Sequence, residues 1–76
     1  MEYKIMQILN EVCGAEDGEL KPDLDLFETG LLDSFAVVQL LVEFEERLHV
    51  TLDIETLRRE DIATPALIVR LLEKMR

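Results

Sequence analysis

The sequence predicts one small all-α domain over residues 1–76, a right-handed bundle of three main helices and one short helix, with a long loop between the first two. Apolar residues recur with helical spacing in three separate segments. Cap residues, glycine or proline stand at the ends of these segments. A chain of this length buries only roughly 60–65 % of its unfolded surface, so a helical core uses most of the 49 % hydrophobic residues. A deep catalytic cleft is therefore not expected.

A first helix is predicted over residues 2–13. One of its faces carries apolar side chains at the i, i+3, i+4 and i+7 positions, namely Ile5, Ile8, Leu9 and Val12. Gly14 follows directly and can adopt the left-handed conformation that ends a helix. Cys13 has no neighbouring histidine or basic residue that would lower its pKa, so we interpret it as a buried or half-buried apolar residue.

Residues 14–33 are predicted to form a long loop, because glycine, proline and aspartate interrupt them repeatedly. Loops of this length in a compact domain tend to be functional, and this one needs apolar side chains to hold it on the core. The candidates are Leu20, Leu24, Leu26 and Phe27. Asp23 and Asp25 do not begin a calcium loop, since the glycine of that motif is displaced and its glutamate is absent. No metal site is predicted.

The strongest helical pattern runs over residues 34–48. The face that we assign to the core carries Val37, Leu40, Leu41, Phe44 and Leu48. A second apolar strip lies beside this face and consists of Phe35, Val38 and Val42, flanked by the acidic Glu45 and Glu46. Such a strip suits a partner-binding face, but the later helices could equally cover it. The pattern alone leaves both interpretations open.

The last third of the chain predicts a short helix and a longer one. Asp53 can cap a short helix over residues 54–59, with Ile54 and Leu57 turned inward. Thr64 and Pro65 then suit the N-cap and first position of a final helix. Its apolar face carries Ile68, Leu71, Leu72 and Met75. His49 is expected to end the preceding long helix, where it can interact with the last carbonyl groups.

The net charge of −9 is uneven along the chain. Residues 1–33 hold nine acidic residues and two lysines, which gives −7, and residues 34–76 hold eight acidic and six basic residues, which gives −2. This balance argues against nucleic acid as a partner and favours partners with basic docking surfaces. No apolar run reaches the ~18 residues of a membrane span and no basic flank with an apolar segment opens the chain. With a single cysteine, we expect a cytoplasmic protein.

Ser34 stands at the predicted start of the long helix and allows two interpretations. Serine is among the preferred N-cap residues, so plain capping is its commonest role in such a place. The unpaired N–H groups and positive dipole end of the helix also suit a phosphate attached to the serine oxygen. Asp33 places a carboxylate beside that hydroxyl. The residues alone leave both roles open.

A hydrolase is excluded by distance. The only histidine is His49, fifteen residues after Ser34 at the other end of the same helix. At 1.5 Å per residue the two would lie roughly 22 Å apart, whereas a nucleophile and its base need about 3 Å. No glycine-rich phosphate loop or nucleophile elbow is present. We therefore predict that the chain is not an enzyme.

The stretch that leads into the long helix reads Leu26-Phe27-Glu28-Thr29-Gly30-Leu31-Leu32-Asp33-Ser34-Phe35. Followed by an acidic amphipathic helix, it resembles the attachment site of acyl and peptidyl carrier proteins, and the order of helices extends this resemblance over nearly the whole chain. The resemblance implies an acyl-carrier-protein-like monomer in which Ser34 accepts 4′-phosphopantetheine from coenzyme A, with Asp33 assisting. It also implies three partners: a phosphopantetheinyl transferase, an adenylating ligase and a downstream acyltransferase. The strip of Phe35, Val38, Val42, Glu45 and Glu46 is then the expected partner face.

Within this family the chain looks most like the D-alanyl carrier proteins of teichoic acid D-alanylation. Leu31 to Phe35, and Thr64-Pro65 followed by Ile68, carry this likeness, whereas fatty-acid carriers usually have leucine after the serine. The departures from that group are Ala36, Val37, Gln39, Glu43 and the lack of tryptophan.

Two alternatives to a D-alanyl carrier follow from these departures and from the capping role of serine. The first is a specialised acyl or aminoacyl carrier of a fatty-acid, polyketide or non-ribosomal peptide pathway, for which a long acyl cargo would call for a shallow apolar groove. The second is a non-enzymatic acidic interaction module in which Ser34 only caps the helix.

Overall fold

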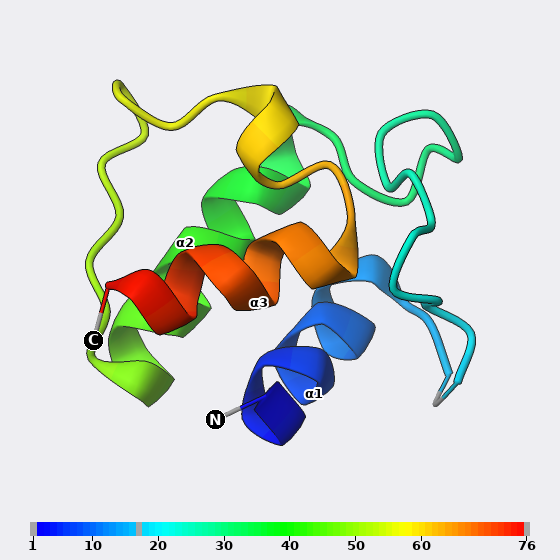
Figure 1. The fold of residues 1–76 in the computed structure, drawn as a ribbon, viewed down its shortest axis with the longest axis horizontal. Coiled ribbons are helices and arrows are strands. Elements are labelled where there is room, and N and C mark those ends of the chain that lie inside the picture. Colours follow the sequence, from blue (N-terminus) through cyan, green and yellow to red (C-terminus); the bar gives the residue numbers. More distant parts are fainter. Residues whose placement is uncertain (1, 17, 76) are drawn as a thin grey trace.

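The computed structural model describes residues 2–16 and 18–75, so that Met1, Asp17 and Arg76 lie outside the described residues. It contains three α-helices, α1 (Glu2–Cys13), α2 (Ser34–Leu48) and α3 (Pro65–Lys74), and one 3₁₀ turn, η1 (Arg59–Asp61) (Figure 1). No strand occurs in these described ranges. The predicted all-α class and the three main helices are confirmed.

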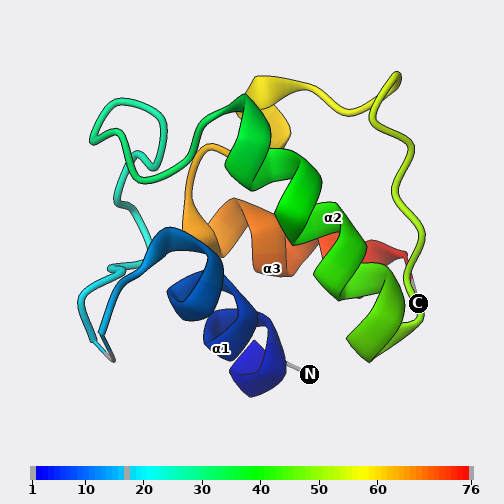
Figure 2. The same ribbon diagram turned by 180° about the vertical axis from the view of Figure 1, so that it is seen from behind.

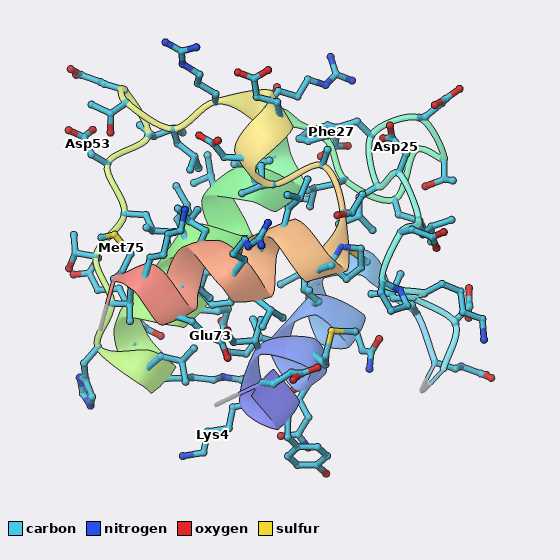
Figure 3. All side chains as sticks on the ribbon, in the orientation of Figure 1. Lys4, Asp25, Phe27, Asp53, Glu73 and Met75 are labelled. Atoms are coloured by element: carbon cyan, nitrogen blue, oxygen red, sulfur yellow. The ribbon has the colours of Figure 1, made fainter. Side chains whose placement is uncertain are left out.

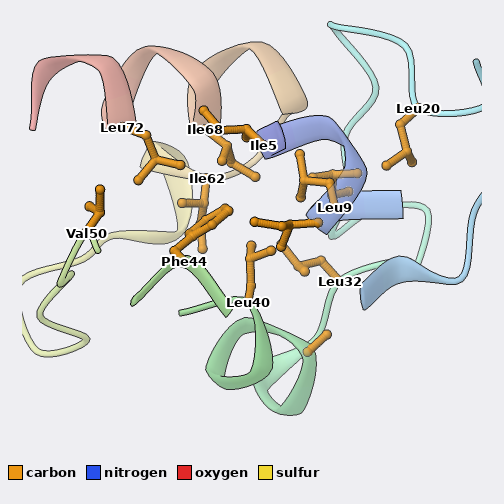
Figure 4. Packing of buried hydrophobic residues seen from close by; sticks show 13 residues of the cluster. Ile5, Leu9, Leu20, Leu32, Leu40, Phe44, Val50, Ile62, Ile68 and Leu72 are labelled. Carbon is orange, nitrogen blue, oxygen red and sulfur yellow. The ribbon is translucent and has the colours of Figure 1, made fainter. Parts of the chain in front are cut away.

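The three helices enclose one core. Helix α1 packs against both α2 and α3, and η1 lies against α3, as the two opposite views show (Figures 1 and 2). Phe44 and Leu40 point from α2 into this core, where they meet side chains of α1 and α3 (Figure 4). Most residues predicted from helical spacing are fully buried: Ile5, Ile8, Leu9, Leu40, Phe44, Ile68 and Leu72. Four others predicted on the same faces are only partly buried: Val12, Leu41, Leu48 and Leu71.

The loop over residues 14–33 is held on this core as predicted. Leu20 and Leu26 are buried, and Leu24 and Phe27 are partly buried against the core. The backbone N–H of Leu26 donates to the carbonyl of Ala63 at 2.7 Å. Such bonds satisfy backbone groups that would otherwise be costly to bury. The loop is thus tied to the segment that leads into α3.

The predicted helix ends are also present. Gly14 follows α1 with φ of 68°, the left-handed conformation that glycine adopts without steric cost. His49 ends α2 with φ of 57°, and its backbone N–H donates to the carbonyl of Glu45 at 3.1 Å. Thr64 caps α3 and Pro65 occupies its first turn.

The prediction of a short helix over residues 54–59 is wrong. The side chain of Asp53 accepts a hydrogen bond from the N–H of Glu55, and its carbonyl accepts from Thr56 and Leu57, which closes an isolated turn. Arg58 is then extended, with φ of −102° and ψ of 149°, so a helix cannot continue through it. The helical turn forms later, at η1, and Ile54 is 52 % exposed instead of turned inward.

Two core assignments also need correction. On α2 the buried residue of the first turn is Ala36, while Val37 is only partly buried. The core face therefore follows the i, i+4, i+8 row of Ala36, Leu40 and Phe44. Met75 is exposed at the C-cap of α3, beyond the last buried turn of that helix (Figure 3).

Candidate functional site

The start of α2 is capped by Asp33, not by Ser34. The Oδ1 of Asp33 accepts a hydrogen bond from the backbone N–H of Ala36 at 2.8 Å, and the Asp33 backbone is extended. Its carbonyl accepts the first helical bond, from the N–H of Val37. These are the marks of an N-cap. Ser34 is the first helical residue, so the alternative in which Ser34 caps the helix is wrong.

Because Asp33 caps the helix, the Ser34 side chain has no capping role. It is exposed, and its hydroxyl makes no hydrogen bond to any residue in the ranges 2–16 and 18–75. The N–H groups of Ser34 and Phe35 belong to the first turn, where a helix offers no internal acceptor. A phosphate on the Ser34 oxygen would meet these donors and the positive end of the helix dipole. The position therefore fits a covalently attached phosphodiester.

The loop before α2 fixes the place of this serine. Leu32 is buried, and its N–H donates to the carbonyl of Leu26 at 2.9 Å. The Oδ1 of Asp25 accepts from the N–H groups of Phe27 and Glu28 at 3.1 and 2.9 Å. Gly30 turns the chain with φ of 79°, a conformation that few other residues adopt. The buried leucine side chains and the hydrogen bonds within the loop therefore hold the Asp33–Ser34 pair at the surface.

The second apolar strip of α2 lies outside the core. Phe35 is 74 % exposed, Val38 48 % and Val42 47 %, so the described parts of the later segments do not cover them. Glu45 and Glu46 are exposed as well. An exposed apolar strip of this kind costs free energy in water unless something binds it, and its flanking carboxylates suit a basic partner.

A groove with a volume of about 560 Å³ begins at Ser34 and runs between α2 and the segment before α3. A shallow apolar groove was expected only for a long acyl cargo, and neither its position nor its lining was predicted from the sequence. Beside Asp33 and Ser34 its lining consists of Phe27, Gly30, Leu32, Val37, Val38, Ile54, Leu57, Arg58, Arg59 and Ile62. The one available signal was Arg58-Arg59, the only adjacent basic pair in an acidic sequence.

Arg59 and Phe27 form one wall of this groove. The guanidinium carbon of Arg59 lies 4.4 Å from the centroid of the Phe27 ring, a cation–π distance. Figure 3 shows Phe27 on the loop close to η1. The contact joins the loop before α2 to the 3₁₀ turn, two segments that lie far apart in the sequence.

Two titratable groups outside this groove have pKa values shifted by their surroundings. Burial raises the pKa of the Cys13 thiol, which keeps it protonated and unreactive. Arg47 holds the pKa of Glu11 below its ordinary value through a bidentate pair with distances of 2.8 and 3.0 Å. No cluster of three metal-binding side chains occurs among the described residues. Within the same ranges, none of the helices has both the length and the apolar character needed to span a bilayer.

Comparison with known proteins gives a consistent match. The family described as "Phosphopantetheine attachment site" matches residues 4–72. Proteins named D-alanyl carrier protein from Bacillus mycoides, Bacillus cereus and Bacillus anthracis are each 46 % identical to the chain over 77 aligned residues. Each alignment covers 99 % of this chain and 98 % of the relative.

Proposed function

The chain belongs to the phosphopantetheine-attachment family, and on this premise we propose that its prosthetic group is attached at Ser34. The family carries 4′-phosphopantetheine covalently, and such a group supplies a terminal thiol that holds a cargo as a thioester. The protein is therefore a carrier and a substrate of other enzymes, and it has no catalytic activity of its own.

The free hydroxyl of Ser34 is the observation that carries the proposal. Ser34 is the only serine of the chain, and Asp33 performs the capping that would otherwise occupy its side chain. Thr29, Thr56 and Thr64 use their hydroxyl oxygens in hydrogen bonds to the backbone. A transferase therefore finds at Ser34 an exposed hydroxyl that can be modified without loss of a cap.

The relatives' name points to the cargo. We propose D-alanine, destined for teichoic acid D-alanylation, because all three named relatives are D-alanyl carrier proteins that align over almost the whole chain. The other candidate is a specialised acyl or aminoacyl carrier. This alternative is supported by residues that depart from the D-alanyl carrier pattern, namely Ala36, Val37 and Glu43, and by the partly apolar groove beside Ser34.

Three partners follow from this function. A phosphopantetheinyl transferase would modify Ser34, an adenylating ligase would form the thioester, and a downstream acyltransferase would accept its cargo. We propose that they contact Phe35, Val38 and Val42, whose exposure is on the side of α2 that bears Glu45 and Glu46. The protein would act as a monomer in the cytoplasm, the compartment that a single unpaired cysteine suits.

The proposed cargo is tested by supplying the phosphopantetheinylated protein with ATP and the adenylating ligase from the same organism. We expect a mass gain of one D-alanyl group that hydroxylamine removes, since a thioester is cleaved by this nucleophile. L-Alanine and octanoic acid serve as competitors. Loading of octanoate in preference to D-alanine would replace the D-alanyl assignment by the acyl-carrier alternative.

The partner face is tested by Val38→Asp, with Leu67→Asp as the matched control. Leu67 is also a partly exposed apolar residue near a helix start, but it lies on α3. Because neither substitution buries a charge in the core, both variants should keep the helical circular dichroism spectrum. We expect a raised KM of the transferase for Val38→Asp alone. Equal KM values for the two variants would remove Val38 from the proposed face.

A further inference from the structure

The groove that begins at Ser34 is lined by both apolar and charged side chains. Apolar side chains dominate its lining, and the partly buried Leu57 and the buried Ile62 belong to them. Its charged lining residues are Asp33, Arg58 and Arg59. Asp33 precedes Ser34 in the sequence, so the single carboxylate lies at the end where attachment is proposed. The two arginines come from the segment on the opposite side.

These two guanidinium groups are weakly neutralised by their neighbours. Arg58 approaches Glu60 only to 3.5 Å, and both of these side chains are more than 70 % exposed. Arg59 lies over the Phe27 ring and has no carboxylate within ion-pair distance among the described residues. Glu60 lines a neighbouring groove and not the one that begins at Ser34. Both arginines also line that neighbouring groove, together with Asp25 and Glu28. The lining of the groove at Ser34 itself carries two positive charges and one negative charge, on a chain of net charge −9.

We propose that Arg58 and Arg59 make this groove selective for the charge of the cargo. The proposal rests on attachment of the prosthetic arm at Ser34. The apolar lining accepts an arm that ends in a thiol or a neutral acyl group, whereas the two arginines repel an aminoacyl group, whose ammonium carries a positive charge. A cationic thioester is therefore kept out of the groove and remains accessible to the enzyme that consumes it.

The charges that line the groove affect a bound group more than the net negative charge of the whole chain does. Salt screens charges beyond about 8 Å at physiological ionic strength, so distant carboxylates contribute little inside the groove. Both arginines line the groove, so an ammonium that entered would share it with two guanidinium groups. Repulsion between like charges in one groove is enough to shift an equilibrium by about tenfold.

Two cargoes that differ only in the ammonium group test the inference. Propionyl and D-alanyl thioesters have the same carbon skeleton, and a transferase of broad specificity can attach either arm to Ser34 from the corresponding coenzyme A thioester. At pH 6.5 an α-amino group, with a usual pKa of about 7.7–8.0, is protonated. The readout is the methyl NMR spectrum of Leu57, Ile54 and Val38 in each loaded protein, relative to the unmodified chain.

We expect the propionyl arm to shift the methyl signals of the groove and the D-alanyl arm to occupy it about tenfold less. The double variant Arg58→Gln/Arg59→Gln should abolish this difference, whereas Arg70→Gln, which removes an exposed arginine from α3, should preserve it. Both arms shifting the signals equally in the wild type would overturn the proposal. Neither arm shifting them, or a difference that survives in the double variant, would also overturn it.

Failure of the underlying attachment gives a separate result. If Ser34 is not the modified residue, the intact mass of the treated protein stays unchanged or the Ser34→Ala variant gains the same mass. The NMR comparison is then made on a protein with no arm at this groove, and both proposals fall together. A correct mass gain at Ser34 with equal spectra for the two cargoes rejects only the charge selectivity.

Discussion

Helices α2 and α3 both begin beside a hydroxyl-bearing residue, and the two hydroxyls are in different situations. At α3 the Oγ1 of Thr64 accepts the N–H of Leu67 at 3.2 Å and so caps the helix. At α2 the equivalent bond goes from Ala36 to Asp33, at 2.8 Å, and Ser34 follows the cap. The hydrogen-bond pattern is the same, but the hydroxyl is used in one helix and free in the other.

This difference separates a structural hydroxyl from one available for chemistry. Modification of Thr64 would remove a cap, whereas modification of Ser34 leaves the Asp33 cap in place and adds an anion where the helix dipole favours one. The presence of a serine or threonine at a helix start therefore does not by itself show whether its hydroxyl is available for modification. The residue that performs the capping decides what the hydroxyl can do.

The largest effect on stability is expected from truncation of the buried residue that anchors the start of α2. Leu32 is buried directly before Asp33, so Leu32→Ala should lower the free energy of unfolding by about 2–5 kcal/mol, the usual cost of truncating a buried leucine. Leu67→Ala, close to the α3 start and partly exposed, should cost less than about 1 kcal/mol. Urea denaturation followed by circular dichroism measures both. Similar losses would show that the loop does not anchor α2 in this way.

The caps themselves should give intermediate effects. Asp33→Ala and Thr64→Ala each remove a capping acceptor, and each should cost about 1 kcal/mol, within the range of 0.5–2 kcal/mol measured for such substitutions. Ser34→Ala should stay within about 0.5 kcal/mol of the wild type, because its hydroxyl caps nothing. The comparison uses the same denaturation assay. A loss at Ser34 as large as that at Thr64 would contradict the assignment of Asp33 as the cap.

Asp33→Asn separates the two roles of this residue. Asparagine caps helices about as well as aspartate, so the stability of the variant should remain within about 0.5 kcal/mol of the wild type. The carboxylate beside the Ser34 hydroxyl is lost, and we expect kcat/KM of the transferase to fall by about tenfold or more. Initial rates with coenzyme A measure this change. An unchanged rate would leave Asp33 with the capping role alone.

The smallest effect is expected away from both helix starts, at the ion pair between Glu11 of α1 and Arg47 of α2. The pKa of Glu11 lies below its ordinary value of 4.5, so the stabilisation is fully present above about pH 4.5 and is lost as the pH falls through the lower folded-state pKa. Glu11→Gln should thus slightly destabilise the protein at pH 7, and this effect should diminish as the pH falls below 4.5. Both groups are largely exposed, so added salt should also reduce the difference. A pH-independent difference would exclude the pair as its cause.

The main helices could be predicted from the sequence because their apolar periods and end signals agree. Residues 2–13 and 34–48 match the observed helices, and the Thr64-Pro65 restart is the observed start of α3. The short helix could not be placed, because six residues give too little periodicity and the turn closed by Asp53 competes with a helix. Ala36 was missed as a core residue because the more apolar Val37 stands beside it.

The position of the candidate site at the start of α2 could be predicted from the sequence, but the roles of its residues could not. The sequence predicts Ser34 at a helix start, where a phosphate would be favoured, yet Asp33 and Ser34 are both good N-cap residues. Which of them caps depends on a register of one residue, and the loop that precedes the helix is folded by hydrogen bonds such as the one from Leu32 to Leu26, which helical periodicity does not predict. The groove with Arg58 and Arg59 depends on how the segment before α3 folds back, which no local pattern encodes.

The most direct test of the account is the intact mass of the protein after incubation with coenzyme A and a phosphopantetheinyl transferase of broad specificity. We predict a gain of one phosphopantetheine group in the wild type and in Thr64→Ala, and no gain in Ser34→Ala, with circular dichroism confirming that both variants are folded. The absence of a gain in the wild type, or a gain that survives Ser34→Ala, would contradict the central claim that Ser34 carries the prosthetic arm.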